Sequence, residues 1–161
     1  MDRFVLERGF SERERAAIVA LLREYEKGVG VSLCFQNFEA EVAGLPGDYA
    51  LPKGQMLLAR DASGDGLLGF VALRPVSAAP ELCEMKRLYV RPAARGRGLG
   101  RELALAAMDE ARRLAYRRMC LDTLPSMREA QALYRSLGFR QIGTSSSEPA
   151  VLLFERELGP P

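Results

Sequence analysis

Histidine is absent from the 161-residue sequence. Its absence excludes serine or cysteine catalysis that relies on a histidine base, and it excludes metal sites of the His-Glu-x-x-His type. A general base in this chain must therefore be a carboxylate, a tyrosine, a lysine or a water molecule held by one of them.

Cysteine is scarce as well. The three cysteines, Cys34, Cys83 and Cys120, are far apart and show no Cys-x-x-Cys spacing, which argues against a disulfide framework or a zinc site. Long apolar runs are missing too: none approaches a membrane span, and the N-terminal segment lacks the apolar core of a signal peptide. We therefore expect a cytoplasmic protein that holds no metal and does not enter a membrane.

An excess of charge of one sign is also lacking. The formal net charge is +2, which is too small to indicate a nucleic-acid partner, so any basic site must be local. With 161 residues the chain fits one domain of ordinary size and buries about 70% of its extended surface. We expect a single domain over residues 1–161.

Periodicity and turn residues predict alternating strands and helices. Strands are expected at 4–8, 55–60, 67–73, 82–90, 117–122, 139–142 and 151–156. Helices are expected at 11–28, where an apolar stripe includes Tyr25, in a short stretch near 35–45, at 99–115 and at 126–137. This order predicts an α/β fold with a mixed central sheet of about six to seven strands flanked by about four helices.

A glycine- and arginine-rich turn follows the strand at 82–90. Its sequence is Arg95-Gly96-Arg97-Gly98-Leu99-Gly100, and Arg101 follows. Glycines at alternate positions let consecutive amides face one point, a helix N-terminus follows directly, and the arginines add positive charge. The turn therefore predicts a pyrophosphate site; the alternative is a tight glycine turn without a ligand.

Two nucleotide-binding motifs do not fit this turn. A P-loop requires Lys followed by Ser or Thr at the helix start, whereas Leu99 and Gly100 follow Gly98. A dinucleotide fingerprint requires a third glycine where this chain has Arg101. The pyrophosphate is therefore expected to belong to another kind of cofactor.

Two signatures in the chain resemble those of the GCN5-related N-acetyltransferase (GNAT) superfamily. The acetyl-CoA signature of that family, Arg/Gln-x-x-Gly-x-Gly/Ala, matches residues 95–100, and Leu88-Tyr89-Val90-Arg91-Pro92 matches the strand and turn before it. Ala130-x-x-Leu133-Tyr134-x-x-x-Gly138-Phe139 matches its C-terminal signature. The resemblance implies an enzyme that transfers the acetyl group of acetyl-CoA, a co-substrate, directly to an amine.

The resemblance also implies which residues hold acetyl-CoA. In that family strand backbone pairs with pantetheine and turn amides hold the pyrophosphate. The residues of this chain at those positions are Leu88, Tyr89 and Val90, and then Arg95, Gly96, Arg97, Gly98, Leu99, Gly100 and Arg101. Where many members have Asn, this chain has Met127 with Ser126 beside it. We expect Ser126 either to replace that contact with the cofactor or only to cap the helix.

Two side chains are predicted to carry the proton transfers. Tyr134 lies where the family places the acid that protonates the departing thiolate; the alternative is a tyrosine that only packs its helix. Glu84 lies six residues before Val90, where related histone acetyltransferases carry their base. Its alternative is an ion pair with Lys86 or an arginine. Asp122 and Glu81 are weaker candidates for the base, and Lys86 is expected to pair with acids or to orient a carboxylate.

The acceptor is expected to bind against residues 31–53, an aromatic and acidic stretch that suits a lid or acceptor pocket; the alternative is an ordinary packed connection. Aromatic residues there are expected to wall a pocket and acidic ones to attract an amine: Phe35, Phe38, Tyr49, Glu39, Glu41 and Asp48. We expect a small primary amine, such as an amino acid, a polyamine or an amine-bearing antibiotic.

Other interpretations of the chain remain open from its sequence. The acceptor is alternatively a protein N-terminus or a lysine, or the chain is a CoA-binding regulatory module without catalysis. Relatives often form dimers, and the last strand, 151–156, is one that could pair with its copy across a twofold axis.

Overall fold

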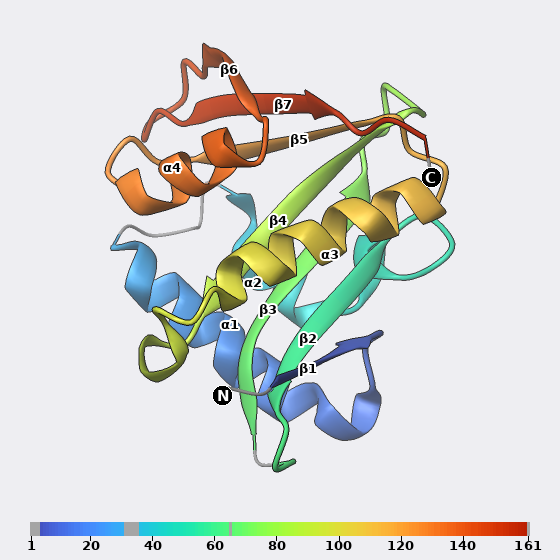
Figure 1. Ribbon diagram of the computed structural model, residues 1–161, viewed down its shortest axis with the longest axis vertical. Coiled ribbons are helices and arrows are strands. Elements are labelled where there is room, and N and C mark those ends of the chain that lie inside the picture. Colours follow the sequence, from blue (N-terminus) through green and yellow to red (C-terminus); the bar gives the residue numbers. More distant parts are fainter. Residues whose placement is uncertain (1–3, 31–35, 65, 161) are drawn as a thin grey trace.

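The computed structural model describes residues 4–30, 36–64 and 66–160 (Figure 1). Its strands are β1 Phe4–Arg8, β2 Gln55–Asp61, β3 Leu67–Pro75, β4 Leu82–Val90, β5 Arg118–Thr123, β6 Arg140–Thr144 and β7 Leu152–Glu157. Its α-helices are α1 Arg15–Val29, α2 Phe38–Ala43, α3 Leu99–Arg113 and α4 Arg128–Ser136. Short 3-10 turns lie at Glu12–Glu14, Gly47–Tyr49 and Pro92–Ala94.

All seven strands form one sheet in the order β1-β2-β3-β4-β5-β7-β6. The β4 and β5 strands are parallel and the other neighbouring pairs are antiparallel. The mixed α/β fold predicted from the sequence is confirmed. Because β7 lies between β5 and β6, both of its edges are already paired. The last strand therefore has no free edge for the pairing with a second copy that the sequence left open, and the edge strands are β1 and β6.

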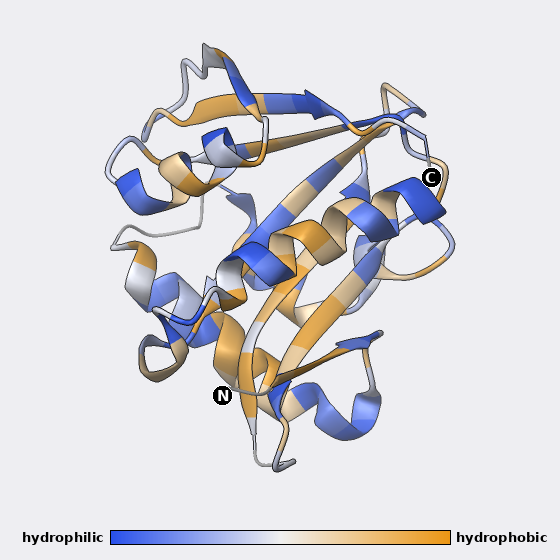
Figure 2. Cartoon of the chain, viewed as in Figure 1, coloured by the Kyte–Doolittle hydropathy of each residue, from blue (hydrophilic) through white to orange (hydrophobic). Residues whose placement is uncertain are grey.

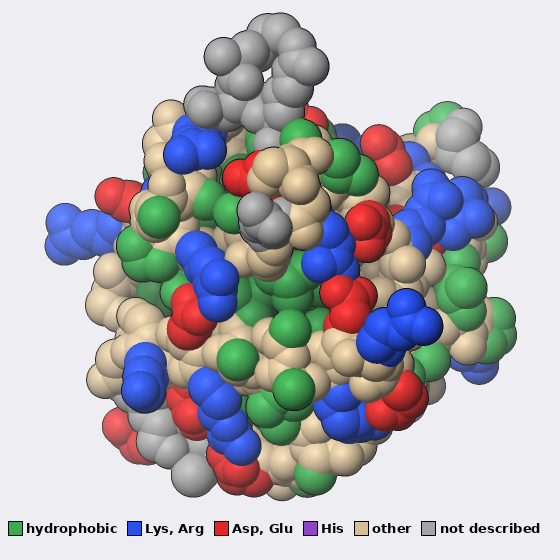
Figure 3. All heavy atoms as spheres, turned by 90° about the horizontal axis from the view of Figure 1, so that it is seen from below, with side chains coloured by type: hydrophobic (Ala, Val, Ile, Leu, Met, Phe, Trp, Pro, Cys, Tyr) green, Lys and Arg blue, Asp and Glu red, His purple; other side chains and the backbone are tan. Residues whose placement is uncertain are grey.

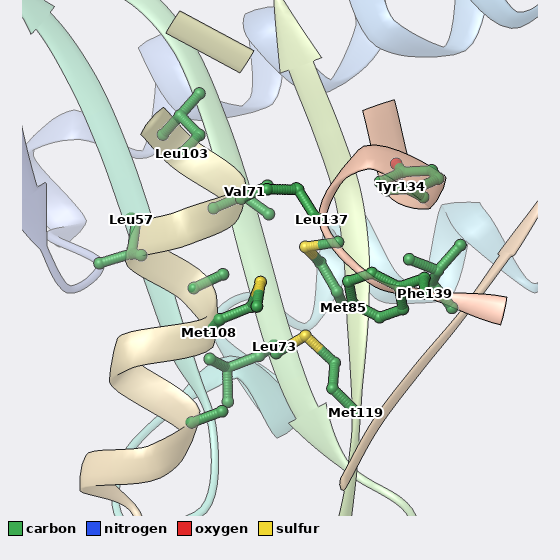
Figure 4. Close-up of a cluster of buried hydrophobic side chains, with 14 of the residues drawn as sticks. Leu57, Val71, Leu73, Met85, Leu103, Met108, Met119, Tyr134, Leu137 and Phe139 are labelled. Atoms are coloured by element: carbon green, nitrogen blue, oxygen red, sulfur yellow. The ribbon is translucent and has the colours of Figure 1, made fainter. Parts of the chain in front are cut away.

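Helices cover both faces of the sheet and bury two separate apolar clusters. On one face, α3 and α4 pack on the middle strands through residues such as Leu103, Met108 and Leu137 (Figure 4). On the other face, α1 and α2 cover β2 and β3 through residues such as Leu21 and Phe38. The hydrophobic stretches of β2 and β3 run between these layers (Figure 2). The sheet is therefore fixed from both sides, which gives rigid support to whatever lies along β4.

The surface shows little segregation of charge on the face seen from below. Basic and acidic side chains lie interspersed there around a hollow lined by hydrophobic side chains (Figure 3). No helix within the described ranges is both long and apolar enough to cross a bilayer. Nor do the described residues include three or more His, Cys, Asp or Glu side chains grouped to hold a metal ion.

Candidate active site

The cleft that holds the predicted site residues opens where β4 separates from β5. The two strands pair only over Leu82–Glu84 and Arg118–Cys120. Beyond Glu84 the strands diverge, and α1 and α4 lie on either side of the gap (Figure 1). The last part of β4 therefore presents backbone N–H and C=O groups that no β5 residue pairs with. Such an unpaired edge can bind an extended ligand by adding it as a strand.

A bulge in β4 changes which side chains face the cleft. Arg87 has a φ of 63°, and the register against β3 shifts there, with Ala72 opposite Lys86 and Phe70 opposite Tyr89. One additional residue reverses the alternation of side chains between the two faces. Lys86 and Arg87 consequently project toward the same side, and both contact Gln36, which precedes α2.

The glycine turn has the backbone conformation that its sequence predicts. Gly96 and Gly98 adopt φ values of 81° and 78°, in the left-handed region that favours glycine, and Gly98 is the N-cap of α3. A Cβ atom added at either position would meet nothing within 4 Å, so the space in front of the turn is open. The open turn leads directly into the N-terminus of a 15-residue helix, an arrangement that favours a bound phosphate.

The remaining residues of the predicted turn lie around these glycines. Arg95, Arg97 and Arg101 are exposed and donate to protein oxygens at 2.9, 3.4 and 3.1 Å respectively. The side chain of Leu99 is buried in the core, so only its backbone can face a ligand. Gly100 lies within ordinary contact distance of Val90, where its missing Cβ would be 3.8 Å from Cγ2.

A groove of about 450 Å³ follows the free edge of β4. It brings together five of the predicted cofactor residues: Leu88, Tyr89, Val90, Arg95 and Ser126. The opposite wall is the end of α1, and the start of α4 closes the groove. Residues 96–101 form the turn that follows and are not part of this wall. At the start of α4, Met127 takes the N-cap position, and no side chain caps the helix. Ser126 is therefore a groove residue and not a cap.

A smaller, inner pocket of about 40 Å³ lies next to the groove. The residues that line both cavities are Tyr25, Val29, Leu88 and Met127. Tyr134, Lys86 and Asp122 line only the inner pocket. The two cavities are therefore neighbours, with the groove along the free edge of β4 and the smaller pocket at Tyr134.

Tyr134 is held rigidly at the inner pocket. Its ring lies edge-on to Phe139, with 6.0 Å between the ring centroids, and it is 7% exposed at the margin of the core below α4 (Figure 4). Burial, with smaller contributions from Tyr25 and Asp122, raises the pKa of the Tyr134 phenol. The hydroxyl is therefore protonated at neutral pH, as a proton donor must be.

Glu84, the predicted base, lies in a network of ion pairs. Its Oε1 accepts a hydrogen bond from Arg74 Nε at 3.0 Å and lies 2.9 Å from Arg74 Nη2 in the same ion pair, and its Oε2 lies 3.9 Å from Lys86 Nζ. On the other side of Lys86, Asp122 Oδ1 is also 3.9 Å from Nζ. The inner pocket is lined by Asp122 but not by Glu84. The structure thus places Tyr134 and Asp122 in one pocket. Glu84 lies outside this pocket and contacts Lys86, which lines it.

Of the described aromatic residues expected to wall an acceptor pocket, Phe38 lies in the core, whereas Tyr49 lies in the core and also lines a hollow together with Glu41 and Asp48. Phe38 and Tyr49 are 1% and 4% exposed and belong to the core between α1 and β3. Phe35 lies outside the described residues. A separate hollow of about 300 Å³ beside Tyr49 is lined by Asp48 and Arg74, among others. Phe38 was expected to line the acceptor pocket because a pattern of aromatic residues does not separate a pocket wall from a core.

Two of the three acidic residues predicted in the same segment, Glu39 and Glu41, are paired with arginines, whereas Asp48 lines the hollow beside Tyr49. Glu39 is hydrogen-bonded by Arg23 across the exposed face of α2. Glu41 accepts two hydrogen bonds from Arg87, at 2.9 and 2.8 Å, and the Arg87 side chain is 1% exposed. Burial acts to raise the pKa of Glu41, but Arg87 outweighs it and the pKa is lowered. These two carboxylates therefore hold α2 in place and are not free to attract an amine.

Tyr25 is the site residue that sequence analysis misses. It lies on α1, lines both cavities and makes edge-on contacts with Phe70 and Tyr89 at 6.3 and 6.0 Å between ring centroids. Sequence periodicity assigns it to the apolar stripe of the helix, and a tyrosine in that stripe is indistinguishable from a core residue. Only the separation of β4 from β5 exposes it to the cleft.

The chain is similar to proteins of a known family. The profile of the Acetyltransferase (GNAT) family matches residues 16–139. An uncharacterized N-acetyltransferase of Schizosaccharomyces pombe is 44% identical over 120 residues, which cover 74% of this chain and 72% of that protein. An uncharacterized N-acetyltransferase of Escherichia coli is 45% identical over 62 residues, covering 38% of this chain and 37% of that protein.

Solved structures show the same fold. The crystal structure of an acetyltransferase of the GNAT family from Staphylococcus aureus superposes with a TM-score of 0.80. The match covers 98% of this chain and 100% of that chain, at 16% sequence identity.

Proposed function

The chain belongs to the acetyltransferase (GNAT) family and is an acetyl-CoA-dependent N-acetyltransferase, and from this we propose that its acceptor is the primary amine of a small molecule, such as an amino acid, a polyamine or an amine-bearing antibiotic. One observation carries the proposal. The groove beside β4, of about 450 Å³, adjoins an inner pocket of about 40 Å³ at Tyr134. We take this confined site as support for a small acceptor, and the acceptor screen below includes peptides because a lysine side chain also fits a narrow pocket.

We assign the groove to acetyl-CoA. Pantetheine pairs with the unpaired backbone at Leu88, Tyr89 and Val90, and Ser126 contributes from the opposite wall. The pyrophosphate lies on the turn amides of residues 95–100 at the start of α3, with Arg101 beside it. This assignment is supported by the free strand edge, the left-handed glycines and the open space in front of them.

The proposed reaction needs one attack and three proton transfers: the ammonium loses one proton before the attack, the attacking nitrogen loses a second once the C–N bond has formed, and the departing sulfur gains one. The neutral amine nitrogen attacks the thioester carbonyl, the C–N bond forms, and the C–S bond breaks. The sulfur departs with the bonding electrons and takes a proton from Tyr134, whose phenol is protonated at neutral pH. The proton released from the nitrogen after the attack restores the Tyr134 phenol through solvent. Backbone amides at the Arg87 bulge, which the shifted ladder leaves outside regular pairing, are suited to stabilise the oxyanion.

The ammonium proton is assigned to a carboxylate beside Lys86. Glu84 remains our candidate for the base, acting through a water molecule because Arg74 binds its Oε1. Asp122 is the alternative, since it lines the inner pocket together with Tyr134. Glu84→Gln and Asp122→Asn separate the two: the variant that lacks the base loses most rate at neutral pH and recovers as pH rises. An unchanged pH profile in both would overturn this assignment.

An acceptor screen that follows release of the free CoA thiol tests the function. Amino acids, polyamines, aminoglycosides and peptides are compared at saturating acetyl-CoA, and turnover with a small amine is expected. Turnover with peptides alone would replace the small-molecule acceptor with a protein. Acetyl-CoA should also raise the melting temperature, because a ligand that binds only the folded state stabilises it. The absence of any shift would remove the cofactor assignment.

A further inference from the structure

Lys86 is a buried lysine whose partners among the described residues all lie at long range. Burial lowers the pKa of its ammonium, and the carboxylates of Glu84 and Asp122 act in the opposite direction. The Lys86 side chain is 5% exposed and lines the inner pocket. Its Nζ lies 3.4 Å from Oε1 of Gln36 and 3.9 Å from carboxylate oxygens of Glu84 and Asp122. An ammonium has three protons to donate, and charge-assisted bonds to carboxylates are usually about 2.7–2.9 Å long. A buried ammonium with only long contacts is therefore suited to receive a ligand oxygen.

The two arginines near Lys86 differ from it in this respect. Arg87 makes two bonds to Glu41 at 2.9 and 2.8 Å. Arg74 forms an ion pair with Glu84, with N···O distances of 3.0 and 2.9 Å. Both guanidinium groups are held by carboxylates of the protein itself. Lys86 is thus the cation of this cluster with hydrogen-bonding capacity directed at the pocket.

We propose that Lys86 binds a carboxylate of the acceptor, so that the acceptor is a zwitterion with its carboxylate close to its amine, as in an α-amino acid. The inference rests on the proposed function and narrows it. The carboxylate binds to Lys86 while the ammonium lies against Asp122, whose Oδ1 is 3.9 Å from Nζ. This spacing places a cation and an anion side by side, as the two charges of an α-amino acid require.

Charge balance in the pocket favours the same class of acceptor. Ion pairs connect four side chains, and their charges balance: two are positive, Arg74 and Lys86, and two are negative, Glu84 and Asp122. A neutral zwitterion enters without leaving a net charge in a buried site. A polyamine or an aminoglycoside brings only positive charge next to Lys86 and Arg87, and it leaves the Lys86 ammonium with only its long contacts to Gln36, Glu84 and Asp122. Such acceptors are therefore disfavoured.

The test compares matched acceptors in the wild type and two variants. Free amino acids with small, aromatic and acidic side chains are each compared with the α-amide and the decarboxylated amine, and spermidine is added as a polycation. The wild type should prefer the acid at least tenfold in kcat/KM. Lys86→Met should lower kcat/KM for the acid about 10- to 100-fold, mainly through KM, and leave the amide within about threefold. Lys86→Arg, which keeps the charge, should retain part of the preference.

Lys53→Met is the matched control, because it removes an equivalent charge from an exposed position. It should leave every acceptor unchanged. Acetyl-CoA binding and the melting temperature of each variant show whether the fold is intact. A wild type that prefers the amide or the amine would overturn the proposal without any variant. So would equal losses for acid, amide and amine in Lys86→Met, because those identify a structural or proton-transfer role.

The outcomes also separate this inference from the proposed function. If small amines without a carboxylate are acetylated as well as amino acids, the carboxylate site fails while the small-molecule acetyltransferase stands. If acetyl-CoA binds but only peptides are acetylated, or nothing is, both proposals fail together.

Discussion

The cleft has two sides that differ in what they present to a ligand. The donor side, where we propose that acetyl-CoA binds, presents backbone, and the acceptor side, where we propose that the amine binds, presents side chains. Along the donor side, a ligand meets the unpaired edge of β4 and the open turn at Gly96 and Gly98. On the side proposed to bind the acceptor, it meets charged groups from two strands, Lys86 of β4 and Asp122 of β5, with Glu84 behind Lys86. The donor side therefore depends on local backbone conformation, and the acceptor side depends on long-range ion pairing.

This difference explains why one side matches a family signature and the other does not. A turn that holds a phosphate through amides needs glycines at fixed spacing, so its sequence is constrained. A charged pocket can be assembled from many combinations of side chains. The four predictions below change one side while the other serves as the reference, and they are ordered by the expected size of the effect.

The largest effect is expected where the two sides meet. Tyr134→Phe removes the hydroxyl proposed as the proton donor and should lower kcat by about 10²- to 10⁴-fold, the usual contribution of a general acid. Acetyl-CoA affinity, measured by calorimetry, should remain within about twofold. Tyr116→Phe is the control, because the Tyr116 hydroxyl bonds to the Lys53 carbonyl and lies outside both cavities. Wild-type turnover in Tyr134→Phe would remove the acid role.

The second effect is on stability at the acceptor side. Arg87→Met leaves the Glu41 carboxylate without its partner and should lower the free energy of unfolding by about 3–5 kcal/mol, as when one member of a buried ion pair is removed. Urea denaturation measures the change. The control is Arg23→Met, which breaks the exposed ion pair between Arg23 and Glu39. Because Glu39 lies on the same helix as Glu41, the two variants are matched, and Arg23→Met should leave stability close to that of the wild type. Equal losses in both variants would contradict the distinction between buried and exposed pairs.

The third effect is confined to the donor side. Gly98→Ala places a Cβ in a left-handed conformation, which costs about 1–2 kcal/mol of stability, and narrows the approach to the turn amides. We expect acetyl-CoA affinity to fall roughly tenfold, since about 1.4 kcal/mol corresponds to that factor. Gly64→Ala has the same kind of strain, with a φ of 90° in the β2–β3 turn. Gly64→Ala should lose about as much stability as Gly98→Ala but bind acetyl-CoA as the wild type does. If Gly64→Ala lost as much acetyl-CoA affinity as Gly98→Ala, backbone strain alone would be responsible for the loss.

The smallest effect is a pH dependence that belongs to the acceptor side. The pKa of Glu41 is lowered in the folded protein because Arg87 outweighs the effect of burial. A group whose folded pKa is lowered stabilises the fold above its unfolded pKa, about 4.3 for glutamate, and loses that contribution as pH falls through the folded value. Stability measured between pH 6 and pH 3 should therefore fall more steeply in the wild type than in Glu41→Gln. Parallel curves would contradict the assignment.

Much of the fold is predictable from the sequence, and the exceptions share a cause. The strand, turn and helix from Leu82 to Arg113 follow from local alternation, glycine spacing and helical periodicity. The pairing of β7 on both edges does not, because sheet order depends on contacts between distant strands. The exposure of Tyr25 to the cleft likewise depends on where β4 separates from β5.

The candidate site divides in the same way. Tyr134 and the glycine turn are identified from motifs, and the structure brings Tyr134, Leu88 and Asp122 to one pocket. The pairing of Glu41 with Arg87 joins residues 46 positions apart, and no local pattern indicates it. The acidic stretch therefore suggested an amine site, whereas its described carboxylates at 39 and 41 are held by arginines.

By itself, the sequence determined the absence of histidine catalysis, the α/β order of elements and the backbone conformation of the glycine turn, because each depends on residue type or on neighbours along the chain. Only the tertiary structure decided which charges are paired and where the small pocket lies. It also decided that Lys86 and its neighbour Arg87 project to the same side of β4, which simple strand alternation does not predict. These depend on one bulge and on the divergence of two strands, and both are set by packing between segments far apart in sequence.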